Sequence, residues 1–141
     1  MLSQTAEYAL RAMACLAMCG TVMTAPALAA QARIPATYLS KVLRMLSVAK
    51  LVRGRRGIGG GYELAKSPKE ISLLHVIDAI DGVSEAGTPE LSRPTGDAAP
   101  RLNQLHGRID AANQAFLDVL GKSSLHDVVL PRSGGPSRVA S

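Results

Sequence analysis

The sequence is poor in aromatic residues and nearly lacks cysteine. Only 3% of its 141 residues are aromatic and none is tryptophan. Leucine, alanine, valine, isoleucine and methionine must therefore build the core, and this composition suits packed helices better than a β-sandwich. Cys15 and Cys19 are too few for a disulfide framework, and their spacing of four favours packing on a helix over a cross-link. We interpret both as small buried hydrophobic residues.

The sequence also lacks an apolar run long enough to cross a bilayer. Residues 1–30 end in an Ala-Leu-Ala that resembles a signal-peptidase site. However, Glu7 offsets Arg11, with which it is expected to pair on a helix, and Gly20 and Thr21 interrupt the apolar stretch. Removal of this segment would also delete helices on which the following elements must pack. We therefore expect a cytoplasmic protein without a membrane partner.

Signatures of catalysis are missing as well. The sequence contains no HExxH, no nucleophile–base pair and no clustered carboxylates, and its histidines, His75, His106 and His126, are scattered. The run GIGGG at 57–61 is not a dinucleotide fingerprint, because a strand-like segment follows it, and it is not a P-loop, because no Gly-Lys-Ser/Thr ends it. The sequence thus argues against an enzyme.

What the chain does contain is a basic amphipathic helix at 37–50. With 100° per residue, its apolar stripe and its polar face separate cleanly. The apolar stripe consists of Leu39, Val42, Leu43 and Leu46. The polar face carries Thr37, Ser40, Lys41, Arg44 and Ser47, with Tyr38 and Met45 at its boundary. This face has hydrogen-bond donors and cations but no acid, which favours a polyanionic ligand.

A glycine-rich basic hairpin follows directly. Arg53, Arg55 and Arg56 lead into GIGGG, and an alternating pattern resumes at 62–64. Residues 33–66 hold eight Lys/Arg and one acid, hence +7, whereas the whole chain is 16 − 11 = +5, so the remainder is −2. A basic patch on a slightly acidic remainder is typical of a ligand for the phosphate backbone of nucleic acid.

The order of expected elements is that of a winged helix-turn-helix. Helices are expected at about 4–19 and 25–32 before the basic helix, and at 73–81 after the hairpin. We predict a mainly α fold with a small β-hairpin wing and a long C-terminal dimerisation helix. Its parts are a DNA-binding domain at 1–82, a loop at 83–100, the dimerisation helix with a short terminal helix at 101–130, and a disordered tail at 131–141.

The long helix has a narrow apolar seam whose members recur at steps of three and four. They are Leu102, Leu105, Ile109, Ala112, Phe116 and Leu120. One helix cannot bury such a seam by itself, so we expect it to pair with its twin in a two-fold dimer. The dimer would present two recognition helices to adjacent major-groove turns.

Four segments together resemble the BadM/Rrf-type bacterial transcription regulators, which include an iron–sulfur cluster regulator, a nitric-oxide-sensing repressor and a cysteine-metabolism repressor. They are MLSQTAEYALRAMACLA, ATYLSKVL, RGIGGGYEL and ISLLHVIDAIDG. The resemblance implies a dimeric winged-helix repressor that binds double-stranded DNA at a pseudo-palindromic operator. Carried over by position, its recognition-helix contacts are Thr37, Tyr38, Ser40, Lys41 and Arg44. Its wing contacts are Arg55, Arg56 and the backbones of Gly59, Gly60 and Gly61.

The chain departs from this family in its sensor segment. Many members hold an iron–sulfur cluster through three cysteines there, whereas residues 83–105 contain none. His106 and Glu7 match ligand positions of some members and are weak candidates, but they cannot hold a cluster without thiolates. We therefore expect no metal site and no cofactor. The family's usual proline in the wing is Ile58 here.

Three readings follow from these patterns. The first is a cluster-free, sequence-specific repressor gated by an unidentified effector, a partner protein or the thiols of Cys15 and Cys19. The second is a protein–protein regulatory module that kept the fold without binding DNA. The third is a cluster or redox sensor with atypical ligands.

Overall fold

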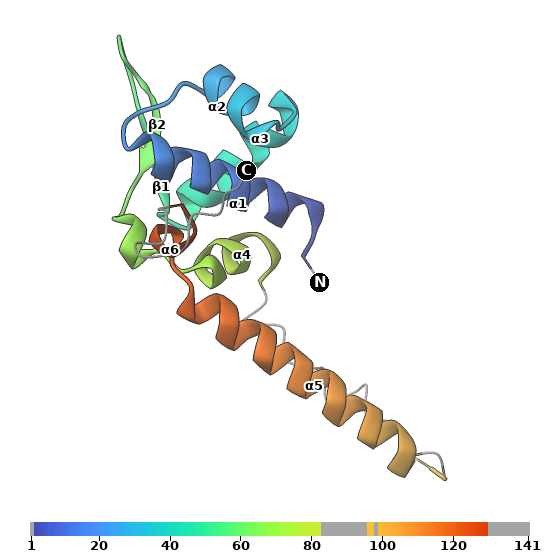
Figure 1. The fold of residues 1–141 in the computed structure, drawn as a ribbon. Coiled ribbons are helices and arrows are strands. Elements are labelled where there is room, and N and C mark those ends of the chain that lie inside the picture. The colour runs from blue at the N-terminus through green and yellow to red at the C-terminus, as the bar shows by residue number, and fades with distance from the viewer. Residues whose placement is uncertain (1, 83–95, 98, 130–141) are drawn as a thin grey trace, which may run out of the picture.

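The computed structural model describes residues 2–82, 96–97 and 99–129 of the chain. The elements are, in order, α1 (Gln4–Cys19), α2 (Ala25–Ala32), α3 (Ala36–Val48), β1 (Val52–Arg55), β2 (Gly61–Leu64), the 3-10 turn η1 (Pro68–Glu70), α4 (Leu73–Asp81), α5 (Ala99–Lys122) and α6 (Leu125–Val129). This confirms the predicted mainly α fold with one antiparallel hairpin (Figure 1). Of the loop predicted at 83–100, residues 83–95 and 98 lie outside the described residues, and its end is wrong, because α5 already begins at Ala99. The predicted tail at 131–141 also lies outside the described residues.

Helix α1 is the centre of the body. It packs against α2, α3, α4, α6 and β2, and Ala6, Ala9, Ala12 and Met13 are completely buried. Small side chains along α1 let the other helices approach it closely, which explains how a core with few aromatic residues is filled. The Ser3 hydroxyl accepts from the Ala6 N–H and caps the helix, as serine does at an N-terminus.

The basic helix is shorter than its sequence predicts. It spans Ala36–Val48 and not 37–50, because the chain turns out of the helix after Ala49, where Lys50 adopts a left-handed φ of 62°. Its predicted apolar stripe is buried: Leu39, Val42, Leu43 and Leu46 are at most 2% exposed. The stripe packs α3 on α1 and leaves the polar face outward.

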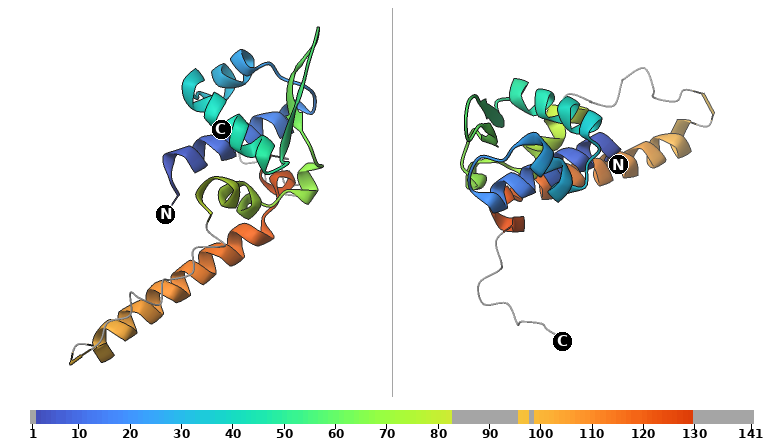
Figure 2. Two further views of the ribbon diagram at one scale, coloured as in Figure 1. Left: turned by 180° about the vertical axis from the view of Figure 1, so that it is seen from behind. Right: turned by 90° about the horizontal axis from the view of Figure 1, so that it is seen from above.

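The hairpin is anchored at its base and free at its tip. Strands β1 and β2 pair antiparallel, with Arg53 opposite Glu63 and Arg55 opposite Gly61. Between α1 and α2, the backbone of Met23 exchanges two hydrogen bonds with Tyr62, at 2.9 and 2.7 Å. These bonds tie the hairpin to the helix-turn-helix, so that its tip projects beside α2 and α3 (Figures 1 and 2).

Helix α4 begins with a reciprocal cap. The Ser72 hydroxyl accepts from the His75 N–H at 3.1 Å, and the His75 ring Nδ1 accepts from the Ser72 N–H at 3.3 Å. This capping box gives His75 a structural role at the start of α4. The short η1 turn before α4 was not predicted, because three residues carry no periodicity.

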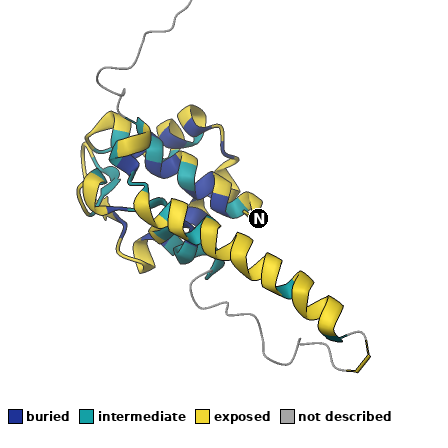
Figure 3. Cartoon of the chain, turned by 60° about the horizontal axis from the view of Figure 1, so that its bottom comes forward, coloured by how far each residue is buried: buried dark blue, intermediate teal, exposed yellow. Residues whose placement is uncertain are grey.

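Helix α5 leaves the body at the end opposite the hairpin tip (Figures 1 and 2). Most of its surface is exposed (Figure 3). Helix α5 contacts α4, and its C-terminal end lies beside that helix (Figure 1). After α5 the chain returns to the body: the Leu73 N–H donates to the Ser123 carbonyl at 2.8 Å, and Leu125 of α6 is completely buried. Within the described residues, no helix is long and apolar enough to cross a membrane.

Cys15 and Cys19 differ in their surroundings. Cys15 is buried, and burial raises the pKa of its thiol while Arg11 opposes the rise. Cys19 is exposed in the last turn of α1, which corrects the expectation that both are buried. A hydrogen bond with the Thr21 hydroxyl, at 3.4 Å, lowers the pKa of the Cys19 thiol.

Candidate nucleic-acid interface

The outward face of α3 carries all five side chains that the sequence assigned to the recognition helix. Thr37, Tyr38, Ser40, Lys41 and Arg44 are exposed. The helix contains no acid, so the field over this face is set by the cations. Its N-terminus has no side-chain cap, and the first N–H groups therefore remain available to an anion.

Tyr38 is held in place from outside α3. Its ring lies against that of Tyr8 of α1, with centroids 5.5 Å apart and planes tilted by 59°. The Arg11 guanidinium lies 4.9 Å from the Tyr8 ring centroid, and Gln4 donates to the Tyr8 hydroxyl at 3.1 Å. Arg11 thus stacks on an aromatic ring, where the sequence predicted a pair with Glu7. The stack fixes the position of Tyr38 while leaving it 43% exposed.

Glycine is required in the wing for two different reasons. A Cβ on Gly60 would collide with the carbonyl oxygens of Arg55 and Gly57 across the turn, and one on Gly61 would collide with the Met23 carbonyl. Gly61 also has a φ of +148°. These contacts explain Gly60 and Gly61 from packing within the chain. Because the glycines carry no side chains, the tip of the hairpin is thin, and Ile58 at this tip is fully exposed.

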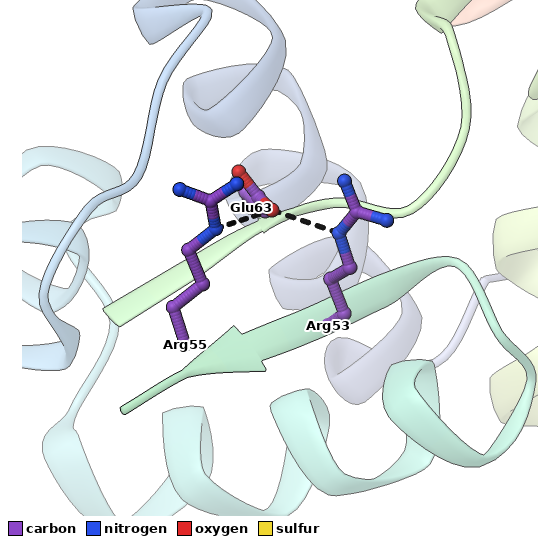
Figure 4. Close-up of polar contacts among 3 residues, drawn as sticks. All are labelled: Arg53, Arg55 and Glu63. Atoms are coloured by element: carbon purple, nitrogen blue, oxygen red, sulfur yellow. Dashed lines mark hydrogen bonds and ion pairs between the residues drawn. The ribbon is translucent and has the colours of Figure 1, made fainter. Parts of the chain in front are cut away.

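Two of the three hairpin arginines share one carboxylate. The Nε atoms of Arg53 and Arg55 lie 2.8 and 3.0 Å from the same Oε1 of Glu63 (Figure 4). The hydrogen bond from Arg53 and the charge of Arg55 lower the pKa of the Glu63 carboxyl. We call this arrangement the Glu63 fork. It orients two guanidinium groups along the hairpin and reduces the charge that they offer to a ligand.

The Glu63 fork was not predicted from the sequence, although the sequence contains a pattern that indicates it. Arg53 and Arg55 are two apart and therefore lie on one face of the strand, and Glu63 is the single acid of the basic segment. Knowledge of the hairpin register would have placed Glu63 opposite Arg53. The Tyr8–Tyr38 contact joins two helices that are distant in the sequence, so the spacing of residues within either helix does not predict it.

The structure brings the predicted residues of α3 and the wing to one end of the molecule. The hairpin tip and α3 flank α2 there, while α5 extends from the other end (Figures 1 and 2). The wing arginines are exposed and the tip is not covered by another described element. The result is a basic surface made of a helix face and a thin finger.

The predicted seam of α5 is uncovered over most of its length. Leu102, Leu105 and Ile109 are 39, 53 and 46% exposed, and Ala112 is also exposed. Phe116 and Leu120, near the body, are half-buried. The distal half of the helix thus presents aliphatic side chains to solvent, while its proximal half is fixed to the body.

Residues 2–131 match the protein family described as Rrf2, iron-dependent transcriptional regulator. The chain belongs to the Rrf2 family. It is 47% identical over 83 residues to a Mycobacterium tuberculosis (strain H37Rv) protein named as an HTH-type transcriptional regulator, and the match covers 57% of this chain and 52% of that protein. It is 34% identical over 98 residues to an rrf2-like regulator of Rhodobacter capsulatus, covering 66% of this chain and 65% of that one. The Rrf2-family chain thus spans about half the length of the mycobacterial relative.

Two solved structures share the whole architecture. The structure of CymR of B. subtilis, whose title calls it the global cysteine regulator, has a TM-score of 0.73 and 26% identity, covering 92% of this chain and 95% of that one. The structure of T. potens IscR has the same TM-score at 22% identity, covering 92% and 85%, and supports the fold alone. The winged-helix architecture of this Rrf2-family chain is therefore shown by both sequence and structure.

The family description names iron, and the donor set of this chain does not fit an iron–sulfur cluster. Both cysteines lie on α1, Cys15 inside the core and Cys19 at its edge. Glu7 is exposed on α1 and His106 is half-buried on α5. Among the described residues, no three His, Cys, Asp or Glu side chains gather as a metal site would require.

Proposed function

We propose that this Rrf2-family chain is a cluster-free, dimeric transcription repressor that binds a pseudo-palindromic operator in the cytoplasm. The observation that carries the proposal is the acid-free, exposed face of α3 beside the protruding basic wing. Both belong to a segment with a charge of +7 in a chain of +5. Such a surface is complementary to the backbone of duplex DNA.

The side chains divide into those that read bases and those that hold the backbone. Lys41 of α3 would address guanine acceptors in the major groove, and Tyr38 would approach base edges from a fixed position. Hydroxyls of Thr37 and Ser40 suit bases or phosphates. Arg56, at the thin tip, would enter the minor groove, where the potential is most negative.

The exposed seam of α5 supports the dimer. Aliphatic residues at 102, 105 and 109 have no partner within the described part of the chain that buries them, and a second α5 would. Because the proximal half of α5 is fixed to the body, pairing would set the distance between the two α3 helices. A spacing of about 34 Å, one turn of DNA, is needed for half-sites on one face of the duplex.

The test begins with DNA recovered with the protein from its native host. A labelled duplex containing the recovered motif and a duplex of the same composition in shuffled order are titrated by fluorescence anisotropy. We expect tighter binding of the motif duplex by about a thousandfold. Lys41→Ala should reduce this preference, with Lys122→Ala on α5 as the control that removes a remote charge.

Two results would count against the proposal. Equal affinity for both duplexes would refute sequence-specific recognition. A folded dimer that binds neither duplex at low salt would favour the protein–protein module.

A further inference from the structure

A hollow of about 430 Å³ lies between the C-terminal end of α1, the base of the hairpin and η1. Its volume falls in the lower part of the range of small-molecule sites. The charged residues that line it are two cations, Arg53 and Lys66, and two carboxylates, Glu63 and Glu70. It lies away from the recognition face, but it shares Arg53 and Glu63 with the Glu63 fork.

We propose that this hollow binds a small zwitterion of the amino-acid type and that the wing senses its occupancy through Glu63. The second half of the proposal rests on the DNA-binding function proposed above.

The charged side chains of the lining favour a ligand that carries one positive and one negative group. A simple anion would meet Glu63 and Glu70, and a simple cation would meet Arg53 and Lys66. A zwitterion places its carboxylate at the cations and its ammonium at Glu70, because Glu63 already accepts from two guanidinium groups. Carbonyl groups at the end of α1 add negative potential near Gly20. Leu16 and Leu64 offer apolar surface to a side chain.

The fork couples the hollow to the wing. Arg53 lines the hollow and competes with Arg55 for one oxygen of Glu63. A ligand carboxylate that draws Arg53 away leaves Glu63 to Arg55 alone, which holds Arg55 more firmly against the hairpin. Arg55 is then less available to DNA phosphates, so the ligand weakens DNA binding. By linkage, DNA weakens ligand binding by the same factor.

Ligand binding is tested first, on the full chain without DNA. Each proteinogenic L-amino acid is titrated separately by calorimetry at millimolar concentration. For each one that binds, the carboxylic acid without its amino group and the amine without its carboxyl group are titrated as well. We expect at least one amino acid to bind and both of its analogues to fail. Glu70→Gln should weaken binding by about tenfold, whereas Lys69→Gln, on the same turn but outside the lining, should leave it unchanged.

Coupling is tested next by measuring DNA affinity with and without that amino acid. We expect an approximately fivefold weakening, at the low end of allosteric coupling because the fork is partly exposed. Glu63→Gln should abolish the response, measured at a ligand concentration that saturates this variant in calorimetry.

The outcomes separate the proposals. Failure of every amino acid to bind, or equal binding by Glu70→Gln and the native chain, would overturn the site. Ligand binding with unchanged DNA affinity would overturn the coupling. DNA binding of the ligand-free chain decides the proposed function independently of both.

Discussion

The unequal partners of the wing arginines lead to a prediction about salt dependence. Arg55 is bound to Glu63 at 3.0 Å, whereas Arg56 lies beyond the strand at the tip and is not part of the fork. Arg56 can therefore reach DNA at no cost in protein contacts, and Arg55 must leave the fork. We expect Arg56→Ala to weaken binding to all duplexes more than Arg55→Ala does.

The magnitude follows from counterion release. Each phosphate neutralised on duplex DNA contributes about −0.9 to the slope of log affinity against log salt. A dimer that loses one such contact per protomer should flatten its slope by about 1.8. Arg56→Ala should approach this value and Arg55→Ala should fall short of it. Glu63→Gln should steepen the slope, by at most about 1.8, because it releases Arg55 in both protomers.

Anisotropy titrations between about 50 and 200 mM salt measure these slopes. Lys122→Ala is the matched control, because it removes an exposed cation from the end of α5, away from the wing. Equal slopes for Arg56→Ala and Lys122→Ala would show that the tip does not contact the backbone. A larger change in Arg55→Ala than in Arg56→Ala would refute the restraining role of the fork.

Three further predictions concern the scaffold. Leu125→Ala, which empties a completely buried site, should destabilise the chain by about 2–5 kcal/mol in urea unfolding, and an unchanged midpoint would contradict the docking of α6. Ile109→Asp on the α5 seam should convert the proposed dimer to a monomer in light scattering with unchanged helicity, and a persistent dimer would exclude this seam. Because the pKa of Glu63 is lowered from 4.5, its stabilising contribution should be present above pH 4.5 and lost as the pH falls through its folded value; unfolding of Glu63→Gln and the native chain should therefore differ at pH 7 and converge in acid.

Periodicity and caps were sufficient to predict the helices of the body. The apolar stripe of α3 recurs at helical spacing, and Ser3, Thr24 and Ser72, residue types favoured at helix N-termini, cap α1, α2 and α4. The C-terminal end of α3 was harder to predict from the sequence, because the left-handed residue that follows this helix is Lys50 and not glycine. Core-facing residues of a single helix could therefore be predicted from their spacing. The end of a helix could not be predicted where neither glycine nor proline marks it.

The candidate interface was predictable in its parts but not in its connections. The exposed side chains of α3 and the glycine tip are local patterns, whereas the Glu63 fork depends on strand register and the Tyr8–Tyr38 contact on helix packing. Cys19 illustrates the same limit. It is exposed because of how the last turn of α1 lies relative to the neighbouring elements, and the sequence does not show this packing. Contacts between elements depend on register and packing, and local sequence patterns do not specify either.

The burial of Leu125 in the same cluster as Ala9, Leu28 and Leu39 has a consequence for synthesis. A nascent chain that has emerged only through α4 still lacks Leu125 in its core, so the helical body reaches full stability only after α6 has also left the ribosome. Because α5 precedes α6 in the chain, the helix with the exposed seam has already emerged when the body is completed.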